Sequence, residues 1–150
     1  MPMIGSLVTM NNLTNFIRLV LSQSKLAMEK GEIPVASLIV DPIDERVIAR
    51  SFNQEIALND PTAHAEILSI RKACKKLNQK RLDGLIMICN LEPCNMCKEV
   101  IKSARLSRVY YLFKNDNPHR KTISTVKYKR IENNEENLIK KFFRNKRTKN

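Results

Sequence analysis

The sequence is poor in glycine, short of acidic charge and without any long apolar run. Three glycines and six prolines in 150 residues exclude collagen-like and linker-like chains. The longest apolar stretches, residues 33–40 and 85–89, fall far below the roughly 18 residues that a membrane span needs. Residues 1–15 hold no Lys or Arg ahead of an apolar run, so we expect no secretory signal. A cytoplasmic protein without membrane association is therefore predicted.

The composition is otherwise that of a globular chain, with 43% hydrophobic and 28% charged residues. Its length is about that of one domain. We expect a single domain over residues 1–150, with a loose N-terminus at 1–11 and a basic C-terminal helix and tail at 135–150.

The acidic deficit leaves 27 Lys and Arg against 15 Asp and Glu, a formal charge of +12. Half of that excess lies in residues 127–150, which hold nine basic and three acidic residues, a net charge of +6. This distribution fits a polyanionic partner, of which nucleic acid is the commonest. On charge alone, a solvated lysine-rich surface fits as well.

Apolar periodicity and turn residues predict four helices and five strands. Helices are expected at 14–30, 62–77, 93–103 and 135–147, and strands at 35–40, 47–52, 85–89, 109–113 and 125–131. Thr62 is the expected N-cap of the second helix, and Pro93 is expected in the first turn of the third. This order predicts an α/β fold with three α/β/α layers around a central mixed, mostly five-stranded sheet.

Two expected helix starts carry metal-binding side chains: residues 62–66 read TAHAE and residues 93–97 read PCNMC. If the two helices lie side by side on one face of the sheet, His64, Cys94 and Cys97 converge. One imidazole and two thiolates suit Zn²⁺, and three protein ligands leave a fourth position for water, as in catalytic sites. A structural zinc site would need a fourth ligand, for which His119 in an unpatterned loop is a candidate. Cys74 and Cys89 lie in apolar patterns and are expected in the core.

Glu66 lies two residues after His64 and can therefore face the water on the metal rather than the metal itself. A carboxylate there can accept a proton from that water and pass it to a substrate. A lone Glu in a first helical turn is more often a partner of the helix dipole. Beside three metal ligands, the general acid–base role is the one we predict.

The two motifs resemble the H-x-E and P-C-x-x-C signature of the zinc-dependent nucleoside and base deaminases. The longer agreement of residues 60–66 and 91–97, with weaker agreement from 12 to 149, is similar to the bacterial tRNA-specific adenosine deaminases in particular. The resemblance implies a cytidine deaminase-like fold, a Zn²⁺ cofactor, a homodimer, and a tRNA anticodon stem-loop as partner. The implied reaction is hydrolytic deamination of the wobble adenosine to inosine by zinc-bound hydroxide, with Glu66 as the proton shuttle.

The same resemblance implies the substrate contacts. Asn53 matches a position that holds the target nucleoside, and Phe142, Phe143 and Arg144 match a helix that meets the anticodon stem-loop. Aromatic rings interleaved with basic residues suit base stacking combined with phosphate contact. We expect at least one of the two phenylalanines to pack on the core instead.

The chain also departs from this family at three places. Residues 98–100 (KEV) replace a small Gly-Ala pair, Leu112 and Phe113 replace a glycine after the fourth strand, and residues 114–120 replace a glycine-rich loop. Two alternative functions stay open: a free-base or mononucleotide deaminase of the guanine deaminase type with the same zinc site, and a non-catalytic zinc-containing RNA-binding module.

Overall fold

A computed structural model describes residues 10–117 and 123–148. Helices and strands follow one another in the expected order: α1 (Met10–Glu29), β1 (Ala36–Asp41), β2 (Arg46–Phe52), α2 (Ala65–Leu77), β3 (Ile86–Leu91), α3 (Asn95–Ser103), β4 (Arg108–Phe113), β5 (Lys127–Arg130) and α4 (Leu138–Thr148). The strands form one five-stranded sheet in the order β2-β1-β3-β4-β5. Because β1 is antiparallel to both neighbours while β3, β4 and β5 are mutually parallel, the sheet is mixed, as predicted.

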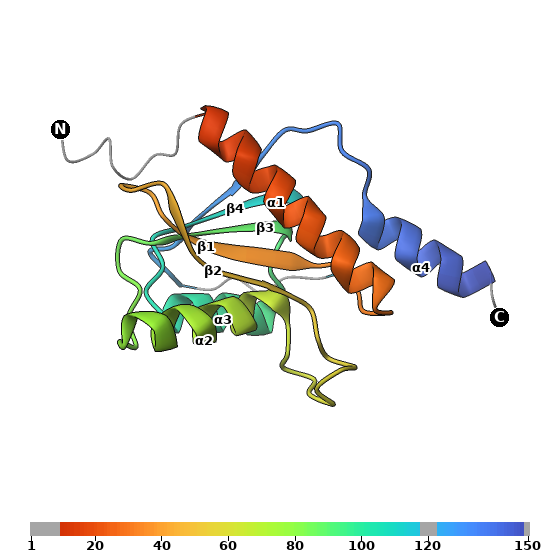
Figure 1. Cartoon of the computed structure of the whole chain (residues 1–150), viewed down its shortest axis with the longest axis horizontal. Coiled ribbons are helices and arrows are strands. Elements are labelled where there is room, and N and C mark those ends of the chain that lie inside the picture. The colour runs from red at the N-terminus through yellow and green to blue at the C-terminus, as the bar shows by residue number, and fades with distance from the viewer. Residues whose placement is uncertain (1–9, 118–122, 149–150) are drawn as a thin grey trace.

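The helices cover both faces of the sheet, with α1 on one side and α2 and α3 on the other (Figure 1). Strand β3 shows why residues 86–89 are all apolar. Ile86 and Ile88 pack in the core beneath α1, whereas Met87 and Cys89 pack in the core beneath α2 and α3. Successive side chains of a strand point to opposite faces, so a strand covered on both faces needs apolar residues at every position. The three-layer α/β/α prediction is confirmed.

Both metal-bearing helices begin two or three residues later than predicted. Helix α2 has His64 as its N-cap rather than Thr62, because the Thr62 amide and hydroxyl both donate to the Asp60 carboxylate, at 2.8 and 2.7 Å. Helix α3 has Cys94 as its N-cap, so Pro93 precedes the helix instead of lying in its first turn. On the buried face of α2, Ile67 is buried whereas Leu68 is only half-buried.

The C-terminal helix begins three residues later than expected. Asn137 caps it, because its side-chain oxygen accepts hydrogen bonds from the Ile139 and Lys140 amides at 3.1 and 3.2 Å. Ile139 and buried residues at the end of β4 belong to one apolar cluster, which places α4 beside α1 (Figure 1). At the other end, α1 already includes residues 10 and 11, which were expected to be loose. Among the described residues, no helix is long and apolar enough to cross a membrane.

Candidate functional site

The structure brings His64, Cys94 and Cys97 together at the start of two helices. The Nδ1 atom of His64 lies 3.6 Å from the Cys94 Sγ atom and 3.4 Å from the Cys97 Sγ atom, and all three ligand atoms lie within 4.8 Å of one another. Sulfur and nitrogen ligands around a tetrahedral zinc ion are about 3.5 Å apart. The cluster therefore has the donor set and the spacing that zinc requires, with Nδ1 as the ligand atom of the imidazole.

The local backbone explains why these side chains are available. His64 and Cys94 both take the extended N-cap conformation, and neither side chain makes a capping hydrogen bond. An N-cap side chain leaves the helix at its end, next to the unpaired amides of the first turn. Two such helix ends meet here, and their positive dipole ends favour thiolates over thiols.

The charges within the cluster are strongly coupled. The hydrogen bond from Cys97 lowers the pKa of Cys94 to about 3, whereas that same interaction, together with burial, raises the pKa of Cys97. The hydrogen bond to Cys94 raises the pKa of His64. A bound divalent ion would ligate both sulfur atoms as thiolates, so metal binding would release the proton of Cys97.

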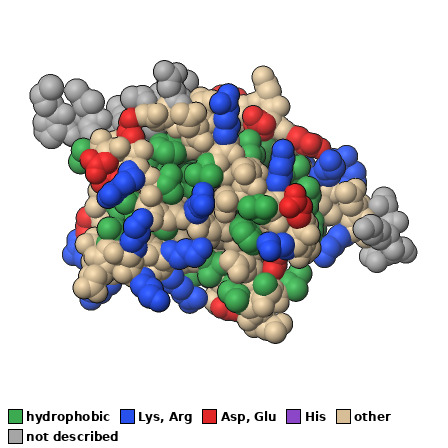
Figure 2. Space-filling view, in the orientation of Figure 1, with side chains coloured by type: hydrophobic (Ala, Val, Ile, Leu, Met, Phe, Trp, Pro, Cys, Tyr) green, Lys and Arg blue, Asp and Glu red, His purple; other side chains and the backbone are tan. Residues whose placement is uncertain are grey.

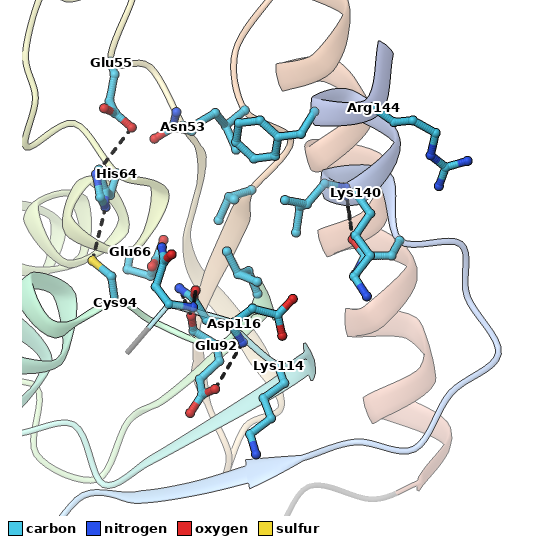
Figure 3. A pocket seen from close by; sticks show the side chains of 18 of the residues that line it. Asn53, Glu55, His64, Glu66, Glu92, Cys94, Lys114, Asp116, Lys140 and Arg144 are labelled. Atoms are coloured by element: carbon cyan, nitrogen blue, oxygen red, sulfur yellow. Dashed lines mark hydrogen bonds and ion pairs between the residues drawn. The ribbon is translucent and has the colours of Figure 1, made fainter. Parts of the chain in front are cut away.

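The carboxylate of Glu55 holds the imidazole of His64, and no motif in the sequence pointed to this contact. Glu55 Oε1 lies 3.4 Å from His64 Nε2, on the side of the ring opposite the thiols (Figure 3). The loop that carries Glu55 is itself held by buried Glu32, whose carboxylate accepts hydrogen bonds from the Ile56 and Ala57 amides at 3.1 and 2.9 Å. A carboxylate on the far nitrogen fixes the tautomer that leaves Nδ1 free for a metal.

Glu66 lies in the first turn of α2 and is 4% exposed. Its Oε1 atom has no hydrogen-bond partner among the described residues. Burial raises the pKa of this carboxyl group. A buried, unpartnered carboxylate oxygen is costly unless something absent from the chain itself binds it, such as water or a substrate.

His64, Glu66 and Cys94 line one cavity of about 770 Å³, shown in Figure 3. Buried Asn53 also lines it, directly after β2. The remaining polar wall comes from the segment that follows β4 and from α4. Together with Glu92 after β3, its charged and amide side chains are Lys114, Asn115, Asp116, Asn117, Asn137, Lys140, Arg144 and Arg147. The cavity therefore has Glu66 and Cys94 beside the metal cluster, and its mouth is basic on the side of α4, where Lys140, Arg144 and Arg147 are exposed.

The residues expected to contact RNA fall into two groups. Phe143 and Arg144 line the cavity, and Phe143 is 42% exposed. Phe142 is 8% exposed and packs edge-on against Phe143, with Lys146 over its ring, so it is the phenylalanine that packs inward. His119 lies outside the described residues, while Cys89 is buried in the core, where we expected it, and Cys74 packs against the core as a half-buried side chain.

Comparison with known proteins identifies the family to which this arrangement of residues belongs. Residues 10–113 match the cytidine and deoxycytidylate deaminase zinc-binding region. The chain belongs to that family. Zinc is accordingly the metal that its His/Cys/Cys cluster suits.

One curated relative and two solved structures show which deaminases this chain is similar to. A tRNA-specific adenosine deaminase of Agrobacterium fabrum is 48% identical over 98 residues, which are 65% of this chain and 63% of that protein. The aligned region thus spans just under two thirds of that curated relative. A solved structure from a study of A-to-I editing by tRNA:A34 deaminases is 44% identical, with a TM-score of 0.67, covering 71% of this chain and 75% of the other. A guanine deaminase structure from Bacillus subtilis is 37% identical, with a TM-score of 0.63, covering 67% of this chain and 64% of the other.

Proposed function

We propose that this chain deaminates the wobble adenosine of a tRNA anticodon loop to inosine, releasing ammonia. The observation that carries the proposal is the buried Glu66 carboxylate, whose Oε1 atom has no hydrogen-bond partner among the described residues and which lies beside a His/Cys/Cys cluster in a cavity with a basic mouth. The tRNA-specific adenosine deaminase relative at 48% identity supports this substrate.

His64, Cys94 and Cys97 would hold the zinc ion, which when bound supplies Lewis-acid activation of water near neutral pH. Glu66 would take one proton from the attacking water and deliver it to N1 of adenine, where it stays in inosine. It would then carry the second proton of that water, from the hydroxyl group formed at C6, to the departing amine. The C6–N bond of adenine breaks, a C6–O bond forms, and the product is inosine. Both proton positions lie on one edge of the base, so one buried carboxylate can serve both transfers.

Asn53 would bind the nucleoside inside the cavity, and Phe143 would stack on an unpaired base at its mouth. Arg144 and the other cations of the rim would contact phosphates, which position the RNA. An anticodon loop already presents unpaired bases, so little energy is needed to bring one into the cavity.

The direct test uses the purified, zinc-loaded chain and an anticodon stem-loop with adenosine at the wobble position. We expect inosine at that position alone. The matched substrate carries guanosine at the wobble position and one adenosine elsewhere in the loop, and it should stay unchanged. Absence of inosine from the first substrate would contradict the proposal.

Deamination of free guanine is the second candidate, because a guanine deaminase structure is also 37% identical to this chain. The basic rim of the cavity disfavours it, since a free neutral base offers no phosphates to these cations. Conversion of free guanine that is indifferent to added stem-loop would favour this alternative. A non-catalytic RNA-binding module is disfavoured by Glu66, because its buried Oε1 atom has no hydrogen-bond partner among the described residues.

We further propose that the chain is a single deaminase domain that works as a cytoplasmic homodimer. Ile56 and Leu58 are 61% and 52% exposed in the loop that carries Glu55, and they offer apolar surface to a second copy. Light scattering on a size-exclusion column should give twice the chain mass. The variant Ile56→Ser/Leu58→Ser should shift that mass toward a monomer.

A further inference from the structure

Lys98 is a nearly buried lysine in the first turn of α3, directly after a metal-ligating cysteine. Its Nζ atom lies 3.5 Å from Glu92 Oε2, and the two side chains are only 14% and 11% exposed. The same ammonium group lies 5.2 Å from the centroid of the Tyr128 ring on β5. A lysine so enclosed needs its carboxylate, since burying an unpaired charge is costly.

Glu92 connects that ion pair to the wall of the cavity. Its carboxylate oxygen Oε1 accepts a hydrogen bond from the Asn115 amide at 3.2 Å, and its carbonyl accepts one from the Asn115 side chain at 3.3 Å. Its own amide donates to the Phe113 carbonyl at 2.8 Å. Two hydrogen bonds thus join Glu92, directly after β3, to the segment that follows β4, and a third joins it to the last residue of β4.

That segment, residues 114–117, forms one side of the cavity opposite the metal cluster, as Figure 3 shows for Lys114 and Asp116. It has no helix or strand of its own. A wall built from a loop keeps its position only as well as its anchoring hydrogen bonds do. Among those described, the bonds to Glu92 are the ones that connect it to β3, the strand that leads to Cys94.

We propose that Lys98 is a positioning residue for substrate binding: it holds the Glu92 carboxylate in place, and Glu92 holds residues 114–117 as a wall of the substrate cavity. The proposal rests on the proposed function for what the wall contacts, namely the RNA. The Lys98–Glu92–Asn115 connection itself is independent of the reaction.

The test compares Lys98→Met with Lys102→Met, which removes an exposed lysine from the same helix. In Lys98→Met, the Glu92 carboxylate should hold the Asn115 amide less firmly. Because a hydrogen bond to a charged group is strong, its loosening should speed amide exchange at Asn115 roughly 10- to 100-fold. The KM for the stem-loop should rise by about tenfold while kcat stays within about threefold, because the zinc ligands and Glu66 are not changed. Lys102→Met should match the unmodified protein in all three measurements.

A double variant that makes both members of the ion pair neutral tests whether the charge of Lys98 serves to hold Glu92. In Lys98→Met/Glu92→Gln no charge is left buried, and the Gln oxygen can still accept the Asn115 amide, so exchange should return most of the way to normal. If Lys98→Met does not fold, Glu92→Gln alone should speed exchange at Asn115 by about threefold or more, since a neutral acceptor binds more weakly than a charged one.

Unchanged Asn115 exchange in Lys98→Met, or in Glu92→Gln if Lys98→Met does not fold, would overturn the proposal, even if the protein makes inosine. If the protein makes no inosine, exchange still tests the Lys98 connection, so failure of the proposed function is distinguished from failure of this inference. Loss of zinc from Lys98→Met, with Asn115 exchange unchanged, would make Lys98 a support of the metal ligands and would also overturn it.

Discussion

Glu66 is a carboxylate that the fold keeps away from water beside two sulfur atoms. We expect Glu66→Gln to keep its zinc and its fold but to make inosine at least 10²-fold more slowly, because an amide of the same shape cannot carry the proton. Zinc content and single-turnover rates measure the two effects separately. Glu99→Gln, on an exposed position of α3, serves as the control and should keep the full rate. A Glu66→Gln rate near that of the unmodified chain would remove Glu66 from the mechanism.

Glu55 acts on the metal only through His64. Removing the carboxylate in Glu55→Ala frees the imidazole to rotate and to change tautomer, so we expect zinc affinity to fall by about 10- to 100-fold. Competition with a chromogenic chelator measures this affinity. Asp44→Ala, which removes an exposed carboxylate in the β1–β2 turn, should leave it unchanged. Equal affinities in the two variants would show that Glu32 and the loop backbone suffice to orient His64.

At the scale of elements, zinc joins the first turns of α2 and α3, so its removal should loosen both. With free zinc at 100 times its dissociation constant, binding adds about 2.7 kcal/mol to the free energy of unfolding. For a chain of this length that corresponds to a melting temperature about 5–10 °C higher with zinc than with chelator. Cys97→Ser should lose this difference, whereas Cys74→Ser, with its cysteine away from the cluster, should keep it. A zinc-dependent rise that persists in Cys97→Ser would exclude that ligand.

Helix α4 divides its two adjacent aromatic rings between the core and the cavity. Phe142→Ala should lower the free energy of unfolding by about 3 kcal/mol, because it opens a hole beneath the helix. Phe143→Ala should leave stability nearly unchanged but weaken stem-loop binding by roughly 5- to 150-fold, the worth of one stacked base. Denaturant titration and fluorescence anisotropy measure the two quantities. The reverse pattern, in which Phe143→Ala destabilises the free protein and Phe142→Ala weakens stem-loop binding, would contradict the assignment of Phe142 to the core and Phe143 to the cavity.

Apolar periodicity and turn residues correctly predicted the order of the helices and strands. The two motifs at helix starts predicted that His64, Cys94 and Cys97 converge. Both predictions depend on patterns that are local in the sequence. The same patterns misplaced the starts of α2 and α3, since Asp60 draws Thr62 into a turn and Cys94 takes the N-cap next to Pro93. Glu55, Lys98 and the cavity wall were not predictable. Their positions depend on how loops fold back over the sheet, and no periodicity records that.

At the scale of the whole molecule, the proposed function raises the question of which Lys and Arg side chains would contact the phosphates of the RNA. Figure 2 shows Lys and Arg side chains gathered over α2, on a face that includes exposed Arg71, Lys75 and Lys76. A second set, Lys140, Arg144 and Arg147, lines the cavity mouth from α4. Net charge alone attracts RNA from any side, whereas contacts with phosphates depend on where the cations lie relative to the site.

The salt dependence of binding separates these two sets. Each phosphate contact contributes about 0.7–0.9 to the slope of log affinity against log salt, so replacing Lys140, Arg144 and Arg147 by Gln should reduce that slope by roughly two to three. Replacing Arg71, Lys75 and Lys76 by Gln removes the same charge from α2 and should change the slope little. Point replacements are needed because a deletion from residue 141 would also remove buried Phe142 and destabilise the fold. Binding of the anticodon stem-loop is measured at several salt concentrations for all three proteins, with zinc content as the check on folding. Equal slopes for the two triple variants would show that overall charge, rather than the α4 rim of the cavity, holds the RNA.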